Sequence, residues 1–183
     1  MTWFTLLIVA VGLERLAELV VSKRNAAWSF ARGGVETGRR HYLVMVVIHS
    51  GLLVGALVEV WLRRPAFVPA LGWTMLALVL AAQALRWWCI CTLGRQWNTR
   101  VIVVPGLPRV TGGPYRYLSH PNYVAVVVEG FALPLVHSAW ITAVVFTLGN
   151  AVLLAVRIRV ENRALHALPS AARAGPPAAE LAP

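Results

Sequence analysis

The sequence predicts an all-α polytopic membrane protein with about five transmembrane helices, the last two forming a helical hairpin, and one long cytoplasmic loop. Hydrophobic residues make up 58% of the 183 residues and charged residues 13%. A soluble domain has about 45–50% hydrophobic residues and about 25% charged residues. The apolar residues form runs near the ~20 residues that a helix needs to cross a bilayer. The charged residues lie mainly in the connections between these runs.

The helices are expected at residues 2–21, 42–62, 69–92, 123–136 and 139–158. The first three runs are near or above the spanning length. The last apolar stretch is interrupted around Pro134 and His137, which predicts a tight hairpin with a short or tilted first arm. We expect a single domain over residues 1–168. The Pro/Ala-rich residues 169–183 are expected to form a disordered tail.

The net charge of +10 indicates topology rather than nucleic-acid binding, because so apolar a chain places its charge at a membrane surface. Thirteen of the seventeen Lys and Arg residues fall on one side if the crossings alternate, and the opposite side receives only Arg63 and Arg64. Cations concentrate on the cytoplasmic side. This distribution predicts an outside N-terminus and a cytoplasmic C-terminus. The Arg- and Ala-rich composition favours a bacterial inner (plasma) membrane.

Cys89 and Cys91 are too few and too close for a disulfide framework, and no metal site is expected. Residues 93–122 form the longest polar stretch and contain four Arg, four Gly and four Pro. Val101 to Val104 is expected to be a short extended piece. Ordered loops of this length are usually functional. The aromatic residues here favour a binding site over a solvated linker.

Two groups of residues stand out as a candidate site. The first is Gly113-Pro114-Tyr115-Arg116 followed by Ser119-His120-Pro121-Asn122-Tyr123, and proline favours a helix start at this point. The second is Arg157 and Glu161, which lie on one helical face at a spacing of four. The alternative for His120 is a capping or interface histidine. For Arg157–Glu161 the alternative is an ordinary interfacial ion pair, which spacing alone favours.

These motifs resemble the isoprenylcysteine carboxyl methyltransferase family of integral-membrane methyltransferases. The resemblance covers roughly residues 93–165. It implies S-adenosylmethionine as the cofactor and a cytoplasmic cofactor-binding loop. It implies catalytic roles for Arg157, Glu161 and His120, and cofactor binding by Gly113, Tyr115, Arg116, His120, Pro121, Tyr123 and Glu161.

The whole chain is most similar to a bacterial branch associated with type III polyketide synthases, which implies O-methylation of alkylpyrones or alkylresorcinols. An isoprenylcysteine-type carboxylate stays open as the acceptor. The family's Arg before His-Pro is Ser119 here, and its acidic pair is Glu161–Asn162. The family's aromatic C-terminal segment is missing. The missing Arg and the missing segment bear on cofactor contacts.

A carboxylate acceptor needs no general base, whereas a resorcinol hydroxyl needs one, from either His120 or Glu161. No G-x-G-x-x-G follows a predicted strand, so a Rossmann-type site is not supported. The alternatives are a membrane NADPH-dependent reductase of sterol-reductase-like architecture and a non-catalytic membrane protein. The expected partners are membrane lipids and a lipid-like acceptor, with no nucleic acid and an unknown oligomeric state.

Ionisable residues inside the apolar runs are expected to face the bundle interior and pair with one another. We expect Glu129 to pair with Arg86 or Arg15.

Overall fold

The computed structural model describes residues 2–173 and, within them, all side chains except those of residues 39–41 and 166–173. Its elements in chain order are α1 (Thr2–Phe30), β1 (Val35–Thr37), α2 (Arg39–Arg63), α3 (Pro69–Leu93), η1 (Gly94–Gln96), β2 (Val101–Val103), η2 (Gly113–Arg116), α4 (Pro121–Leu135) and α5 (Trp140–Arg173). The chain is therefore mostly helical, as expected.

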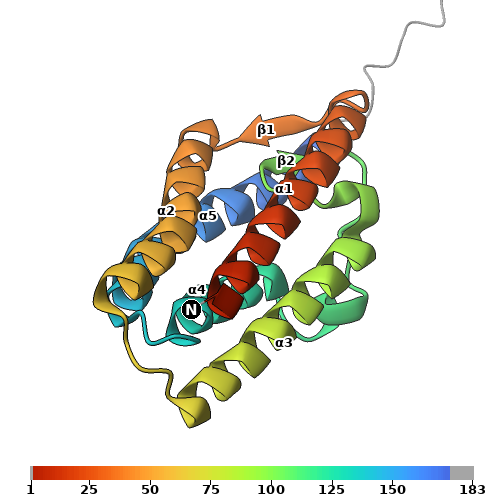
Figure 1. Ribbon diagram of the computed structural model, residues 1–183. Helices are drawn as coiled ribbons and strands as arrows, with labels where there is room; N and C mark the ends of the chain where they lie inside the picture. The colour runs from red at the N-terminus through yellow and green to blue at the C-terminus, as the bar shows by residue number, and fades with distance from the viewer. Residues whose placement is uncertain (1, 174–183) are drawn as a thin grey trace, which may run out of the picture.

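The five helices form a bundle in which the α4–α5 hairpin lies behind α1 (Figure 1). Helix α4 packs on α3, and α5 packs on α2 and α4. The buried core lies towards the N-terminal end of α1, where Phe4 and Ile8 meet Val60 of α2, Val79 of α3 and Leu133 of α4. The hairpin was predicted at this place, and the structure confirms it.

Three helices are long and apolar enough to cross a membrane, over Tyr42–Arg63, Pro69–Gln96 and Trp140–Leu165. This supports an integral membrane protein. Helix α4 has 15 residues, about 22 Å at ~1.5 Å per residue, which is less than the ~30 Å hydrocarbon core. Helix α1 is long, but Glu14, Arg15 and Glu18 interrupt its apolar run. Crossings by α1 and α4 stay predictions.

Helix α1 ends nine residues later than predicted because tertiary contacts extend it. Asn25 donates hydrogen bonds to the carbonyl oxygens of Gly94 and Trp97, at 3.1 and 2.7 Å. Ser22 lies 2.8 Å from the Thr99 hydroxyl and accepts a hydrogen bond from the Thr99 amide. The polar side of this last part of α1 is therefore buried against residues 94–99, an arrangement that hydropathy alone does not reveal.

The expected extended piece at residues 101–104 is strand β2, which pairs antiparallel with β1. No strand was predicted at residues 35–37, so the all-α description needs this small correction. Helix α5 continues to residue 173, past the predicted end at 158, so the first five residues of the predicted tail are helical. Residues 174–183 lie outside the described part of the chain.

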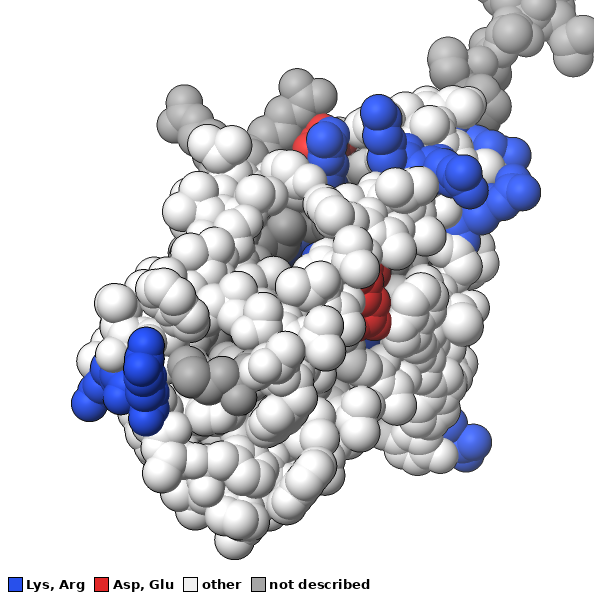
Figure 2. All heavy atoms as spheres, viewed as in Figure 1, with Lys and Arg blue, Asp and Glu red and all other residues white. Residues whose placement is uncertain are grey.

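A cluster of charged side chains joins α1, α3 and α4 inside the bundle. Arg86 of α3 donates to Glu129 of α4 at 2.5 Å, and Arg15 of α1 lies 3.3 Å from the same carboxylate. Arg15 also pairs with Glu18 at 2.8 Å. The expected pairing of Glu129 is confirmed with both cations. Figure 2 shows red acidic atoms in a furrow between the α1 and α3 surfaces, with blue basic atoms beside them.

Glu59 of α2 has a structural role at the start of α5. Its carboxylate accepts hydrogen bonds from the backbone amides of Ile141 and Thr142, at 3.1 and 2.7 Å. A helix begins with unpaired amides and a partial positive charge, so a carboxylate there stabilises it. Glu59 thus holds the start of α5 in place. The position of that helix in turn positions the residues at its other end.

Positive charge gathers at both ends of the bundle, and more of it at one. Blue side chains cluster where α1 ends beside β1, and a smaller group lies over the end of α2, which carries Arg63 (Figure 2). The N-terminus lies at the end away from β1 (Figure 1). The polar loop and the end of α5 therefore share the more basic end.

Candidate functional site

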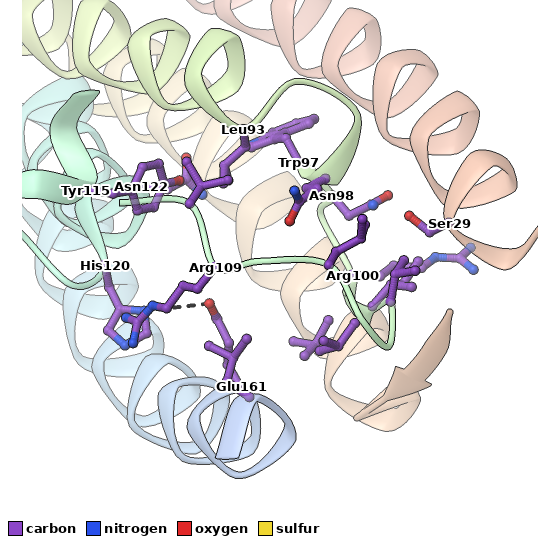
Figure 3. A pocket seen from close by; sticks show the side chains of 18 of the residues that line it. Ser29, Leu93, Trp97, Asn98, Arg100, Arg109, Tyr115, His120, Asn122 and Glu161 are labelled. Atoms are coloured by element: carbon purple, nitrogen blue, oxygen red, sulfur yellow. Dashed lines mark ion pairs between the residues drawn. The ribbon is translucent and has the colours of Figure 1, made fainter. Parts of the chain in front are cut away.

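A pocket of about 470 Å³ opens at the basic end of the bundle, between the polar loop and the ends of α4 and α5. Tyr115, His120 and Asn122 lie on one side of it and Asn98 and Ser29 on the other, with Glu161 below (Figure 3). Apolar residues of the loop line the space between them, including Leu93, Leu107 and the run Val101 to Val104. The pocket thus combines an apolar slot with a polar, charged end.

The turn before α4 packs closely against α3 because it contains a glycine, which has no Cβ. Gly113 has a φ of +56° and begins η2, and a Cβ there would collide with the Thr92 hydroxyl. Pro121 is the buried first residue of α4, as predicted for a proline in a first helical turn. These two residues fix the backbone position from which the side chains of His120 and Tyr123 extend.

Tyr123 connects the two predicted site residues of α5. Its hydroxyl donates a hydrogen bond to a Glu161 carboxylate oxygen and accepts one from Arg157 Nε at 3.3 Å. The Arg157 guanidinium lies 5.7 Å from the Tyr123 ring centroid. The expected alternative, a direct ion pair between Arg157 and Glu161, is replaced by this tyrosine bridge.

Arg157 is buried, with 9% of its surface exposed, and its hydrogen-bond acceptors are neutral. Besides Tyr123 they are the Thr99 carbonyl oxygen at 2.6 Å and the Met45 sulfur. A buried guanidinium normally pairs with a carboxylate, because leaving its charge uncompensated is costly. Among the described residues Arg157 has no carboxylate in ion-pair contact, and it lines the pocket.

His120 lies between Glu161 and Asn162. Its Nδ1 is 3.6 Å from a Glu161 oxygen, its Nε2 is 3.2 Å from the Asn162 side-chain oxygen, and its ring stacks on Tyr123 at 5.4 Å. The contact with the Glu161 carboxylate holds the pKa of His120 above its ordinary value. Burial raises the pKa of Tyr115 far above neutrality, so that phenol stays protonated.

Of the predicted site residues, Tyr115, His120, Tyr123, Arg157 and Glu161 line the pocket. The other three lie elsewhere. Gly113 and Pro121 shape the turn behind the pocket wall, and Arg116 is exposed, 6.0 Å from the ring of Tyr117. Arg116 therefore does not line the pocket in this structure.

Sequence reasoning missed several residues that the fold brings to the pocket. Arg109 and Asn162 line it, and Met45 and Thr99 hold Arg157. Asn122, which belongs to the predicted motif but had no predicted role, also lines it. Asn162 stood out only as a departure from an acidic pair, and its contact with His120 gives that position a role. Met45 carries no sequence signal, because it is one apolar residue within an apolar helix.

The fold and the pocket define a class: a small helical membrane protein with a basic pocket at one end of its bundle. The model of the isoprenylcysteine carboxyl methyltransferase family matches residues 73–167, just over half of the chain. The chain belongs to this family, which indicates a membrane methyltransferase. All the pocket residues assigned above from the resemblance lie within the matched region.

Two bacterial relatives extend the similarity over most of the chain. The uncharacterized protein YpbQ of Bacillus subtilis is 38% identical over 163 residues, covering 88% of this chain and 96% of the relative. An uncharacterized protein of Haemophilus influenzae is 26% identical over 154 residues, covering 82% and 88%. No solved structure matches the chain.

Proposed function

We propose that the protein is an S-adenosylmethionine-dependent O-methyltransferase that methylates a lipid-like acceptor at the membrane. The observation that carries the proposal is Arg157, a buried guanidinium without a carboxylate partner in the described part of the chain, on the wall of a pocket that Glu161 and His120 also line. Membership of the family supplies methyl transfer as the class of reaction.

The pocket has the size and chemistry that such a cofactor requires. Small-molecule sites enclose about 300–1,000 Å³, and this pocket encloses about 470 Å³. The apolar slot formed by Leu93, Val101 and Leu107 suits the adenine ring. Glu161 suits a positively charged sulfonium and amino group, since it is the acidic side chain on the described pocket wall. When bound, the cofactor supplies a methyl group on sulfonium sulfur for in-line transfer.

Arg157 has the role of binding the acceptor oxygen. Its neutral partners fix the orientation of the guanidinium without neutralising it. A guanidinium is well suited to hold an oxyanion through two parallel hydrogen bonds. Holding that oxygen in line with the methyl group supplies most of the rate enhancement expected of such a site, through positioning and electrostatics.

The proton requirement depends on the acceptor. A carboxylate is already ionised at neutral pH and needs no base. A resorcinol hydroxyl must lose a proton, and the groups in reach are Glu161, which already accepts from Tyr123, and His120. The bridge from Arg157 through Tyr123 to Glu161 would keep both side chains oriented while the proton moves.

The acceptor is proposed to be an alkylpyrone or alkylresorcinol hydroxyl, with an isoprenylcysteine-type carboxylate as the second candidate. Three helices that are long and apolar enough to cross a membrane support an acceptor whose long alkyl chain remains in the bilayer. The loop end of the bundle is proposed to be cytoplasmic, because most cations lie there. A soluble cofactor then enters from that side.

The test begins with cofactor binding. Purified protein in detergent should bind S-adenosylhomocysteine in calorimetry and should transfer a labelled methyl group to one acceptor of a panel of alkylpyrone, alkylresorcinol and prenylcysteine. His120→Ala should reduce turnover strongly without changing the circular dichroism spectrum. Folded protein that binds NADPH and not S-adenosylhomocysteine would instead support a reductase, and normal turnover of the variant would remove His120 from the site.

A further inference from the structure

Three arginines line the pocket, and two of them are engaged by the protein itself. Arg157 donates to three neutral acceptors. Arg100 lies 3.7 Å from Glu36 and 5.0 Å from the ring centroid of Tyr42. Arg109 forms no hydrogen bond or ion pair within residues 2–173. Among these three arginines, Arg109 is therefore the one whose side-chain donors the described residues leave without an acceptor.

Arg109 also lies next to a second group that carries positive charge. Figure 3 shows its side chain extending towards His120 from the loop above. The contact with Glu161 favours protonation of His120, whereas the charge of Arg109 opposes it. An anion held between Arg109 and the imidazole would reduce this repulsion. The exposed Ser119 hydroxyl lines the same wall and can donate to that anion.

The position of Arg109 distinguishes it from Arg157. Four consecutive loop residues, Leu107 to Val110, line the pocket, and Arg109 is exposed to solvent while Arg157 is buried among helices. A soluble anion reaches Arg109 from the loop side. Under the proposed function, Arg157 binds the acceptor oxygen. The two cations thus suit two different anionic groups within one pocket.

We propose that Arg109, with Ser119 and His120, forms a carboxylate subsite that binds the amino-acid end of the cofactor. The inference rests on the proposed function, because it assigns one end of the same pocket. Arg109 supplies a cation beside His120 from a different part of the loop.

The test compares two ligands that differ only in the carboxylate, S-adenosylhomocysteine and S-adenosyl-3-thiopropylamine. Dissociation constants are measured in detergent by calorimetry, or by competition for the weaker ligand. The wild-type protein should prefer S-adenosylhomocysteine about ten- to a hundredfold, as expected for a charge-assisted hydrogen bond. Arg109→Gln should bring this ratio close to one. Arg109→Lys should retain part of it, because the charge remains.

Arg95→Gln is the matched control. Arg95 is exposed on η1, carries the same charge and does not line the pocket, so the ratio should stay at the wild-type value. An unchanged ratio in Arg109→Gln would overturn the subsite, and so would equal weakening of both ligands. A raised KM for the acceptor with an unchanged ligand ratio would assign the anion to the acceptor instead. Failure of the wild-type protein to bind either ligand would contradict the proposed function itself.

Discussion

At the scale of single residues, the site depends on hydrogen bonds and contacts between side chains of three segments. Tyr123 at the start of α4 orients both Arg157 and Glu161 of α5, and His120 at the end of the loop contacts Glu161 and Asn162. Each group is held by at least one other, which is the arrangement that precise positioning requires. Substitution of one of these residues should therefore disturb the positions of its neighbours.

The contact of His120 with Glu161 predicts a pH dependence of stability. The pKa of His120 is raised in the folded protein relative to its ordinary value of 6.5, so the folded state binds this proton more tightly than the unfolded state. The contribution is fully present below about pH 6.5 and is lost as the pH rises through the higher folded pKa. Melting temperatures in detergent should therefore fall over this range.

The variant His120→Asn should lack this slope while keeping a polar side chain at the position. Glu161→Gln should lack it as well, because the carboxylate is the main cause of the shift. Parallel pH profiles for wild-type protein and both variants would contradict the assignment.

At the scale of elements, the hairpin of α4 and α5 is the unit that builds the site, and its packing relies on one glycine. A Cβ at Gly130 of α4 would overlap the ring of Phe146 on α5. Glycine in a helix is intrinsically unfavourable compared with alanine, so its presence here reflects this close approach. The two helices thereby bring Tyr123 to Arg157.

Gly130→Ala should lower the free energy of unfolding by about 1–3 kcal/mol, the usual result of overpacking. Gly51→Ala is the matched control, because Gly51 of α2 is exposed and a Cβ there would meet nothing within 4 Å. That change should be neutral or slightly stabilising, by up to about 1 kcal/mol. Thermal unfolding in detergent measures both, and equal effects would contradict the packing argument.

At the scale of the whole molecule, the internal charged cluster connects α1, α3 and α4 and carries an imbalance. It contains three carboxylates, Glu14, Glu18 and Glu129, and two guanidinium groups, Arg15 and Arg86. Removing one cation leaves excess negative charge inside the bundle, where isolated charges are costly. The cluster is therefore expected to be more sensitive to loss of Arg86 than to loss of Glu129.

Arg86→Leu should lower the free energy of unfolding by about 3–5 kcal/mol. Glu129→Gln should cost less, because the remaining charges balance. The double variant should recover part of the loss, since it restores the original charge difference. Denaturant unfolding of the three variants in detergent tests the order, and an Arg86→Leu variant no less stable than Glu129→Gln would contradict it.

Much of the fold could be predicted from local pattern. Pro121 and the break around Pro134 located the hairpin, because proline positions constrain the backbone locally. The pocket residues His120, Tyr123, Arg157 and Glu161 were identified through motif spacing and family resemblance. The greater length of α1 was not predicted, because Ser22 and Asn25 are polar in the sequence and become buried only against residues 94–99. Pairing of β1 with β2 likewise depends on segments far apart in the chain.

The sequence by itself determined that this is a helical membrane protein with most of its positive charge at one end, because hydropathy and charge placement are properties of composition and order. It also determined the family, because the motif residues are contiguous or at short spacing. Only the tertiary structure decided which groups meet: Tyr123 between Arg157 and Glu161, Asn162 beside His120, and Arg109 above the pocket without a partner in the described chain. The contacts among Tyr123, Arg157, Glu161, His120 and Asn162 join residues 34, 38 and 42 positions apart. Packing of the helices, rather than local preference, brings them together.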